Sequence, residues 1–420
     1  MRGAFLGLAL MALPGLLAAQ DFFTLKGHGG PIMSIAAAPD GRIATASFDN
    51  AVGLWSDGAP DWFDGHEAAV NTVIFDGQTL ISGGDDHTIR RWPDGTLIGR
   101  HERKVMGLAL GPGLLASASW DGTIGLWPTD GEARFLRGHQ QGVNAVGFAP
   151  DGRLYSASTD GTLRVWNLQT GDNRVILRHG FGINEMVIHP DGWLAYGAVD
   201  GVTRIIDLET ETELRDFTLD RRPVLALALS PDGRTLAVGD GDGFIMVVDT
   251  DSWRITRDYR ATLRGPVWAL AFSPDGQNIH AGGIDDAMYS WPIAQLDAFD
   301  QMATGERTFL KDPALMENGE RQFARKCSIC HTLSAGSARR AGPSLHGLFG
   351  RKAGAVSDYL YSETLTGSDI IWTEDSVDAL FDEGPDYYIP GSKMPMQRIT
   401  DPQDRADLIA YLRRATRGEN

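Results

Sequence analysis

The chain has 420 residues, of which 42% are hydrophobic, and this composition supplies apolar material for two folded cores. Its formal net charge is −17; residues from Arg307 onward hold 15 basic and 16 acidic side chains, so the preceding part carries −16. Such an acidic surface argues against nucleic acid as a partner, because phosphates carry the same sign. The charge can serve solubility or attract a basic redox partner, and the sequence leaves both readings open.

The N-terminal segment has the pattern of a secretory signal. Arg2 is followed by an apolar run, Ala4–Ala19, that Pro14 interrupts. The run is shorter than the roughly twenty residues that span a bilayer. A basic start, an apolar middle and small residues at the end are typical of an export signal. We expect residues 1–20 to be removed by cleavage, which leaves no stable membrane span; an uncleaved N-terminal anchor is the alternative.

Residues 21–295 contain a repeat. In five units a histidine is followed, 26 or 27 residues later, by a tryptophan or an isoleucine. The pairs are His28 and Trp55, His66 and Trp92, His101 and Trp127, His139 and Trp166, and His179 and Ile206. Val248 and Trp291 extend the series to seven, with an aspartate six positions before each member. Pro-Asp-Gly turns separate short runs of alternating apolar residues, which is the pattern of strands and tight turns.

This repeat resembles the WD-repeat family, whose blades span roughly 40–45 residues each. The resemblance implies an all-β propeller of seven blades, in which ring closure protects the sheet edges. Asp21–Gly27 has no preceding partner and is expected to complete the last blade as its outer strand. The resemblance also implies buried hydrogen-bonded tetrads, which explain the histidines without a metal. The tetrads are expected at His28, Ser47, Asp49 and Trp55, at His101, Ser119, Asp121 and Trp127, and at His139, Ser158, Asp160 and Trp166, whereas blade two lacks the hydroxyl at Gly84.

A short linker, residues 296–312, is expected to lead into a second domain, residues 313–420. This domain contains Cys327-Ser-Ile-Cys330-His331, and Cys-x-x-Cys-His is the attachment pattern of a c-type haem. Each thiol can bond one vinyl group of the porphyrin, and the adjacent imidazole then faces the iron. These are the only two cysteines of the chain. The alternatives are a dithiol redox pair and half of a zinc site, but the further paired Cys or His ligands that zinc requires are not found.

A second axial ligand is expected downstream. Haem c commonly takes methionine or histidine there, and Met394 follows Pro390-Gly391, a turn that lets a loop run close over a flat ring. From about residue 313 to 417 the sequence resembles the class I cytochromes c, which are all-α electron-transfer proteins. The motifs that carry this resemblance are Gly319 and Phe323, residues 342–352, Ile371-Trp372 and residues 405–412.

The resemblance implies a role for individual residues. Pro343 would accept a hydrogen bond from the ring N–H of His331, which fixes the tautomer of the proximal ligand. Met394 would be the distal ligand, with Ser392 just before it. Buried propionates require hydrogen-bond partners, and the residues expected to supply them, directly or through water, are Arg351, Tyr359, Tyr361 and Trp372.

Some positions depart from the family or compete with these roles. Phe381 stands where relatives often carry a tyrosine that faces the distal ligand, so a hydroxyl is missing. Met396 is a rival ligand, and we prefer Met394 because it immediately follows Pro-Gly-Ser-Lys. His346 is expected at the surface rather than on the iron. His189 and His280, in the propeller, are expected to be ordinary surface or core residues.

Together these features predict a periplasmic c-type cytochrome with one covalently bound haem, which transfers single electrons and uses its propeller to dock a redox partner protein. An iron with both axial positions filled moves electrons but does not readily bind substrate. Two alternatives stay open, since a fold does not determine a function. One is a redox enzyme whose propeller holds an active site, and the other is a maturation or scaffold protein for a respiratory enzyme.

Overall fold

The computed structural model describes residues 21–217, 223–262, 265–296 and 316–417, except for positions 329, 338–339, 341, 391, 393 and 395–397. The predicted signal, residues 1–20, lies outside the described part, as does all of the predicted linker except its first residue. In these ranges no helix has the length and the hydropathy that crossing a bilayer requires.

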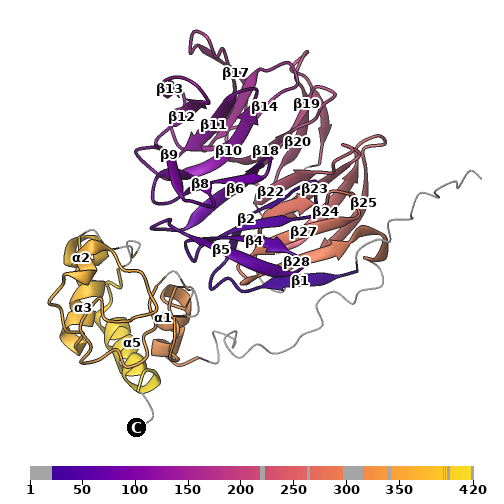
Figure 1. Ribbon diagram of the computed structural model, residues 1–420. Helices are drawn as coiled ribbons and strands as arrows, with labels where there is room; N and C mark the ends of the chain where they lie inside the picture. The colour runs from indigo at the N-terminus through magenta and orange to yellow at the C-terminus, as the bar shows by residue number, and fades with distance from the viewer. Residues whose placement is uncertain are drawn as a thin grey trace, which may run out of the picture.

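The N-terminal part forms seven four-stranded antiparallel sheets, which are arranged as the blades of a propeller (Figure 1). Seven sequence repeats therefore predicted the number of blades correctly. Six blades take four consecutive strands from the chain, and the seventh combines the last three strands with the first.

The strands of blades one to four are β2 (Ile32–Ala37), β3 (Ile43–Ser47), β4 (Ala51–Ser56), β5 (Ala59–Asp64), β6 (Val70–Asp76), β7 (Thr79–Gly84), β8 (Thr88–Trp92), β9 (Thr96–Arg100), β10 (Val105–Gly111), β11 (Leu114–Ser119), β12 (Thr123–Pro128), β13 (Arg134–Arg137), β14 (Val143–Phe148), β15 (Leu154–Ser158), β16 (Thr162–Trp166) and β17 (Asn173–Arg178). Those of blades five to seven are β18 (Ile183–Ile188), β19 (Trp193–Ala198), β20 (Thr203–Asp207), β21 (Glu213–Asp216), β22 (Val224–Leu229), β23 (Thr235–Asp240), β24 (Phe244–Asp249), β25 (Arg254–Arg260), β26 (Val267–Phe272), β27 (Asn278–Gly283), β28 (Ala287–Pro292) and β1 (Phe23–Lys26).

Strand β1 closes the ring. It pairs antiparallel with β28, with Leu25 opposite Met288, and the two side chains are buried in one cluster. The outer strand of the last blade therefore comes from the start of the described chain, as the sequence predicted. Repetition of blades around a closed ring leaves only short, protected sheet edges.

The innermost strand of every blade carries the same irregularity. Its register with the next strand shifts just after its first residue, as between Ile32 and Ser34 in blade one. The shift recurs at Val70, Val105, Val143, Ile183, Val224 and Val267. Such bulges bend a strand and sharpen its twist. The first residue is a fully buried Ile or Val in each case, so the bend starts from an anchored side chain.

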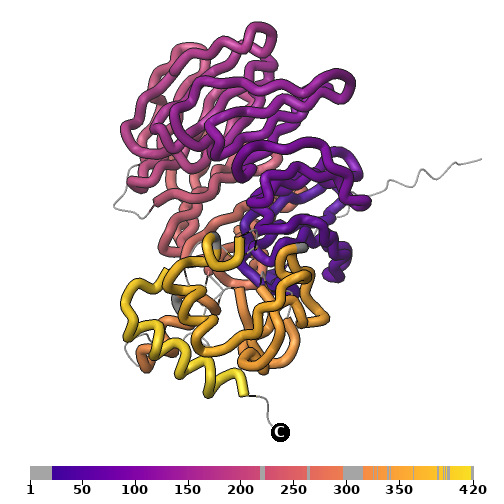
Figure 2. Tube along the Cα trace, turned by 90° about the vertical axis from the view of Figure 1, so that its left-hand side faces the viewer, coloured from indigo at the N-terminus to yellow at the C-terminus, as the bar shows by residue number. Residues whose placement is uncertain are grey.

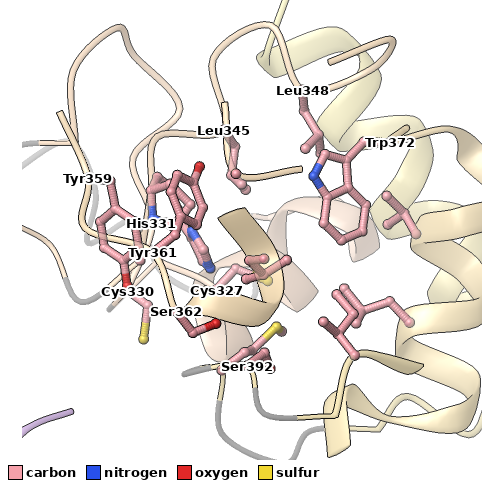
Figure 3. Close-up of a pocket in the computed structure, with 18 of the residues that line it drawn as sticks. Cys327, Cys330, His331, Leu345, Leu348, Tyr359, Tyr361, Ser362, Trp372 and Ser392 are labelled. Carbon is pink, nitrogen blue, oxygen red and sulfur yellow. The ribbon is translucent and has the colours of Figure 1, made fainter. Parts of the chain in front are cut away.

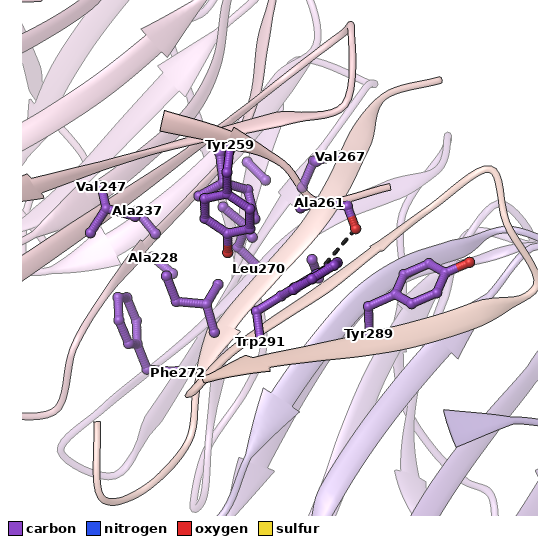
Figure 4. Packing of buried hydrophobic residues seen from close by; sticks show 14 of the residues in the cluster. Ala228, Ala237, Val247, Tyr259, Ala261, Val267, Leu270, Phe272, Tyr289 and Trp291 are labelled. Atoms are coloured by element: carbon purple, nitrogen blue, oxygen red, sulfur yellow. Dashed lines mark hydrogen bonds between the residues drawn. The ribbon is translucent and has the colours of Figure 1, made fainter. Parts of the chain in front are cut away.

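The core of the propeller lies between neighbouring sheets. Between blades six and seven, Tyr259 and Trp291 pack with their ring centroids 5.7 Å apart (Figure 4). The indole Nε1 of Trp291 donates a 3.1 Å hydrogen bond to the carbonyl oxygen of Ala261. In blade seven the indole N–H of the tryptophan is therefore hydrogen-bonded to a backbone carbonyl rather than to a serine hydroxyl. Alternating strand residues from two sheets interdigitate in this way around the ring.

The predicted tetrads form, but their hydroxyl residue was assigned wrongly. In blade one, Trp55 Nε1 donates to Thr45 Oγ1 at 2.8 Å, and that hydroxyl lies 2.7 Å from His28 Nε2. Ser47 instead donates to the Gly30 carbonyl and accepts from the Asp49 backbone. The corresponding tetrad hydroxyls are Ser82, Ser117 and Ser156, rather than Ser119 and Ser158 in blades three and four. Blade two therefore has a complete tetrad, despite Gly84.

The tetrad hydroxyl was assigned wrongly because side chains on a strand return to the same face every two residues. Thr45 and Ser47 lie on the same face of β3, so the sequence pattern alone did not separate them. The register decides: Ile43 lies opposite Trp55, and Thr45 lies opposite Gly53. Gly53 has no side chain, which leaves the indole of Trp55 free to reach diagonally to Thr45. Ser47 lies beyond the reach of this pairing.

The C-terminal part is helical. Its elements are α1 (Asn318–Lys326), α2 (Glu363–Thr366), α3 (Glu374–Glu383), α4 (Pro385–Tyr388) and α5 (Pro402–Ala415), after the short 3₁₀ turn η1 (Ile293–Gln295) that ends the propeller. Local signals fix the helix starts. Thr373 and Ser376 form a capping box before α3, and Asp401 caps α5, whose first residue is a proline.

Helices α1 and α5 cross closely because of one glycine. A Cβ on Gly319 would lie 2.8 Å from Cβ of Tyr411 and would also collide with the Asp407 carbonyl. Phe323, one turn on, packs against Tyr411 with ring centroids 5.7 Å apart. Leu408 is fully buried in the same cluster. Both sides of this contact lie in motifs that carry the class I cytochrome c resemblance.

Candidate haem site

A single pocket in the helical domain brings together most of the site residues that the sequence predicted (Figure 3). Most of its lining comes from the end of α1, the loop after it, α2, the segment before α3, α3 itself and the loop before α5, with Leu412 of α5 and a few propeller residues completing it. The predicted residues among the lining are Cys327, Cys330, His331, Pro343, Arg351, Tyr359, Tyr361, Trp372, Ser392 and Met394. Residues separated by almost 70 positions therefore surround one space.

The two cysteines are placed by the end of α1. Helix α1 finishes at Lys326, and the backbone then turns, with the amides of Cys330 and His331 donating to the Cys327 carbonyl at 3.1 and 2.9 Å. This turn presents both thiols and the imidazole to the same pocket. Burial raises the pKa of Cys327 to about 12 and that of Cys330 to about 11, so both are neutral thiols at physiological pH.

His331 is held in one orientation. Its Nδ1 lies 2.7 Å from the Pro343 carbonyl oxygen, which only accepts, so Nδ1 carries the proton and Nε2 is left as the basic nitrogen. Burial lowers the pKa of His331 and keeps the ring neutral, as ligation of a metal requires. Gly342 makes the close approach feasible, since a Cβ there would lie 2.7 Å from His331 Nδ1.

A further part of the lining is apolar. Met394, Phe381 and Ile389 line the pocket and belong to the buried cluster of the helical domain. Ser392 is held by its backbone amide, which donates to the Ile389 carbonyl at 3.1 Å. Phe381 is 5% exposed and places no hydroxyl in this part of the lining. The rival methionine, Met396, lies outside the described residues, as do Gly391 and Lys393.

Polar groups gather at one side of the pocket. The Arg351 guanidinium donates to the carbonyls of His346 and Ser344, at 2.6 and 2.7 Å, while still lining the pocket. Burial raises the pKa of Tyr359 and Tyr361, whose rings pack edge to face at 4.9 Å between centroids. These hydroxyls remain neutral donors across the physiological range.

The sequence reasoning missed Ser362. Its hydroxyl is buried, lines the pocket and has no hydrogen-bond partner among the described residues. Figure 3 labels it among the residues that line the pocket. An unpaired buried hydroxyl is costly and therefore calls for a polar group of a ligand. The signal was available, because Ser362 directly follows Tyr361, but a serine in a loop is too common to stand out.

The residues present fit a haem c. A largely apolar pocket offers a neutral imidazole with a free Nε2, a thioether in the same lining, and two thiols at the attachment spacing. Arg351 and the orphaned Ser362 hydroxyl supply donors for carboxylate groups. His346 is half-buried and does not line the pocket, so the structure does not offer it as a ligand.

The propeller presents no comparable set of ligands. Within the described ranges, His, Cys, Asp and Glu side chains form no group of three that could hold a metal ion. His189 stacks on Trp193, with ring centroids 4.4 Å apart, and donates to the Gly233 carbonyl. His280 is buried beside Ser290, and burial lowers its pKa to about 4. Both have the structural roles that the sequence suggested.

A second cavity follows the axis of the propeller and is lined by the innermost strands of all seven blades. Among its lining residues Glu185 is the one charged side chain. Burial raises the pKa of Glu185 to about 7, although its Oε1 accepts a 2.9 Å hydrogen bond from the Met186 backbone. The sequence gave no reason to single out this residue.

Comparison with known proteins matches both parts of the chain. A family model described as cytochrome c matches residues 316–416, and one described as WD domain, G-beta repeat matches residues 20–56, 61–93, 132–167, 212–249 and 257–291. Cytochrome c of Sesamum indicum is 44% identical over 105 residues, which are 25% of this chain and 93% of the relative. Cytochrome c of Cochliobolus lunatus is 43% identical over 103 residues, which are 24% of this chain and 93% of that relative. Cytochrome c of Theileria parva is 44% identical over 98 residues, which are 23% of this chain and 84% of that relative.

Proposed function

This chain belongs to the cytochrome c family and carries a WD-repeat propeller before its cytochrome domain, and from this premise we propose a more specific role. It is an exported protein with one covalently bound haem c, which moves single electrons to or from a protein held by the propeller. The cytochrome domain implies electron transfer, and the propeller suggests protein interaction. The single haem, the export and the redox partner are the proposal.

The observation that carries the proposal is that His331 and Met394 line one pocket. His331 Nε2 is the free nitrogen, because Nδ1 is engaged by Pro343, and Met394 lies in the apolar part of the lining. A haem bound here supplies a one-electron iron couple. His331 and Met394 would hold its iron, so exchange of electrons would be favoured over binding of substrate.

The neighbouring residues set the conditions for that exchange. Phe381, Ile389 and Leu380 exclude water from the methionine side, and an apolar environment disfavours the more highly charged oxidised state. Methionine ligation acts in the same direction. Electron transfer at a comparatively high potential is therefore the expected behaviour.

Two sequence features support a single haem and export. The chain has only two cysteines, and both belong to one attachment motif. The basic and apolar start of the chain matches an export signal, and a periplasmic location accords with haem c attachment outside the cytoplasm in bacteria. The acidic balance of the N-terminal part favours a basic partner, with an association rate that falls as salt is added.

The proposal is tested on the full chain expressed with its native N-terminus in a bacterium that matures c-type cytochromes. We expect the protein in the periplasmic fraction, lacking about twenty residues, with the mass of one haem retained after denaturation. Cytoplasmic protein without haem would refute the export and attachment claims. The variant in which Cys327 and Cys330 are both alanine should reach the same compartment without covalent haem.

A further inference from the structure

The haem pocket has a wall that belongs to the propeller. Five propeller residues line the same cavity as Lys326, Cys327 and Cys330 of the cytochrome domain: Phe48, Asn50, Ala68, Ala69 and Asp85. All five lie in loops on one face of blades one and two, between β3 and β4, β5 and β6, and β7 and β8. In two perpendicular views the helical domain lies beside these first blades (Figures 1 and 2).

This wall is firmly held by the propeller. The Asp85 amide donates to the Ala69 carbonyl at 2.7 Å, and the Asp85 carboxylate accepts from Asn71 Nδ2 at 2.7 Å. The Phe48 amide donates to the Pro31 carbonyl at 2.9 Å. Backbone and side chain together thus fix the loops, so the surface that faces the cavity is rigid before anything binds to it.

Blades two and three differ in the size and charge of the side chains on this face. Counting from the tetrad histidine, Ala68-Ala69 in blade two takes the place of Arg103-Lys104 in blade three. The Lys104 ammonium lies 3.7 Å from the ring centroid of Trp120, over a face open to solvent. Small side chains at these positions in blade two leave room for the cytochrome domain, and Ala69 is only 5% exposed.

The residue before the tetrad aspartate also differs in exposure between blades one and three. Trp120 holds this position in blade three and is 41% exposed, whereas Phe48 holds it in blade one and is half-buried at the cavity. The blades that face the haem pocket therefore present two alanines and a half-buried phenylalanine, beside the polar Asn50 and Asp85. At the matching positions the next blade presents an exposed aromatic and two cations. The apolar part of the wall excludes water from the side of the pocket that it closes.

We infer that blades one and two are a built-in cover for the haem of the same chain. Phe48, Ala68 and Ala69 close one side of the cavity that the attachment cysteines also line, so the propeller limits access of solvent and small redox molecules to the haem. This inference rests on the haem of the proposed function. It adds that the propeller protects the haem as well as holding a partner.

The position of the wall is tested by methyl NMR on the full haem-loaded protein with labelled alanine. Ferric low-spin iron has an unpaired electron, and ferrous low-spin iron has none, so methyl groups near the haem shift with oxidation state. We expect the Ala68 and Ala69 signals to shift between the two states, while the signal of Ala195, in the core of blade five, stays fixed. Unchanged Ala68 and Ala69 signals would overturn the inference.

The shielding is tested by electron exchange with two small probes, anionic hexacyanoferrate and cationic cobalt tris-phenanthroline. Phe48→Ala removes the largest apolar side chain of the wall without changing charge, so both rates should rise severalfold. The matched control is Trp120→Ala, the same loop position in blade three, which should leave both rates unchanged. Equal rates in Phe48→Ala and the original chain would contradict the cover.

A second variant guards against simple loss of structure. Ala68→Arg with Ala69→Lys places the blade-three pair in blade two, and blade three shows that this loop accommodates both side chains. It should raise the rates for both probes, whereas a purely electrostatic effect would raise one and lower the other. If the haem spectrum is normal but no variant alters access, the cover fails and the electron-transfer proposal stands. If no haem is attached, the proposed function itself fails.

Discussion

Nδ1 of His331 lies 2.7 Å from the carbonyl oxygen of Pro343, and this contact determines which nitrogen of the imidazole faces the haem pocket. A backbone carbonyl accepts hydrogen bonds and cannot donate them, so the proton must sit on Nδ1. Gly342 allows the approach by having no Cβ. The geometry of the proximal ligand therefore depends on a glycine and a proline as much as on the histidine.

Gly342→Ala tests this dependence. Its Cβ would lie 2.7 Å from His331 Nδ1, so the ring must move or the loop must shift, and overpacking of this kind costs about 1–3 kcal/mol. We expect a lower thermal stability of the cytochrome domain and a perturbed low-spin spectrum. The control is Gly347→Ala, where a Cβ meets nothing within 4 Å but the backbone has a positive φ. An unperturbed haem spectrum in Gly342→Ala would contradict the account.

Met394→Ala tests the distal ligand. Loss of the thioether should abolish the weak red absorption band of ferric methionine ligation and should lower the reduction potential. Met396→Ala is the control and should retain both properties. If the band disappears in Met396→Ala and remains in Met394→Ala, the assignment of the ligand is wrong.

Ser156→Ala tests the corrected tetrad. Ser156 Oγ accepts from Trp166 Nε1 at 2.8 Å and lies 2.7 Å from His139 Nε2, so alanine leaves two buried groups unpaired. We expect a loss of about 2–4 kcal/mol in stability and a shift of the Trp166 indole N–H resonance. Ser158→Ala, two residues on, removes a different bond, to the Gly142 carbonyl, and should leave that resonance in place. The reverse pattern would restore the assignment made from sequence.

Asp160 predicts a pH dependence of propeller stability. Burial alone would raise the pKa of Asp160, but hydrogen bonds from Thr162, the Gln140 amide and His139 lower it from 3.8 to about 2. A depressed pKa stabilises the folded state above pH 3.8, and this contribution is lost as the pH falls toward 2.

Asp160→Asn should therefore destabilise the propeller near neutral pH by on the order of 1–2 kcal/mol, with a difference that shrinks between pH 4 and 2. Urea unfolding followed by circular dichroism measures it. The control is Asp151→Asn, in an exposed turn of the same blade, which should change the free energy of unfolding much less. A difference that stays constant down to pH 2 would contradict the pKa assignment.

Much of the fold could be predicted from the sequence because its signals are local. The regular spacing of the tryptophan positions, together with Ile206 and Val248, predicted the number of blades, and the unpartnered start of the described chain predicted the strand that closes the ring. The tetrad hydroxyl could not be predicted, because Thr45 and Ser47 share a strand face and only the register with Trp55 separates them. Ser362 was missed for a related reason, since its significance appears only when the pocket leaves its hydroxyl unpaired.

The contribution of the propeller to the pocket was also beyond the sequence. Ala68 and Ala69 are unremarkable in a loop, and their meaning depends on a cytochrome domain that begins some 250 residues later. By contrast, the candidate attachment cysteines and proximal ligand could be proposed from the sequence, because covalent attachment requires fixed spacing between Cys327, Cys330 and His331. A site whose chemistry depends on short sequence spacing can be predicted from the sequence, whereas a contact between distant segments cannot.

The most direct test of the central claim is a spectroelectrochemical titration of the exported full chain, combined with its intact mass under denaturing conditions. We predict the mass of one attached haem, a low-spin spectrum in both oxidation states, and a single one-electron transition that Met394→Ala moves to lower potential. A chain without covalent haem, or a high-spin iron that binds small ligands at once in the unaltered protein, would contradict the account.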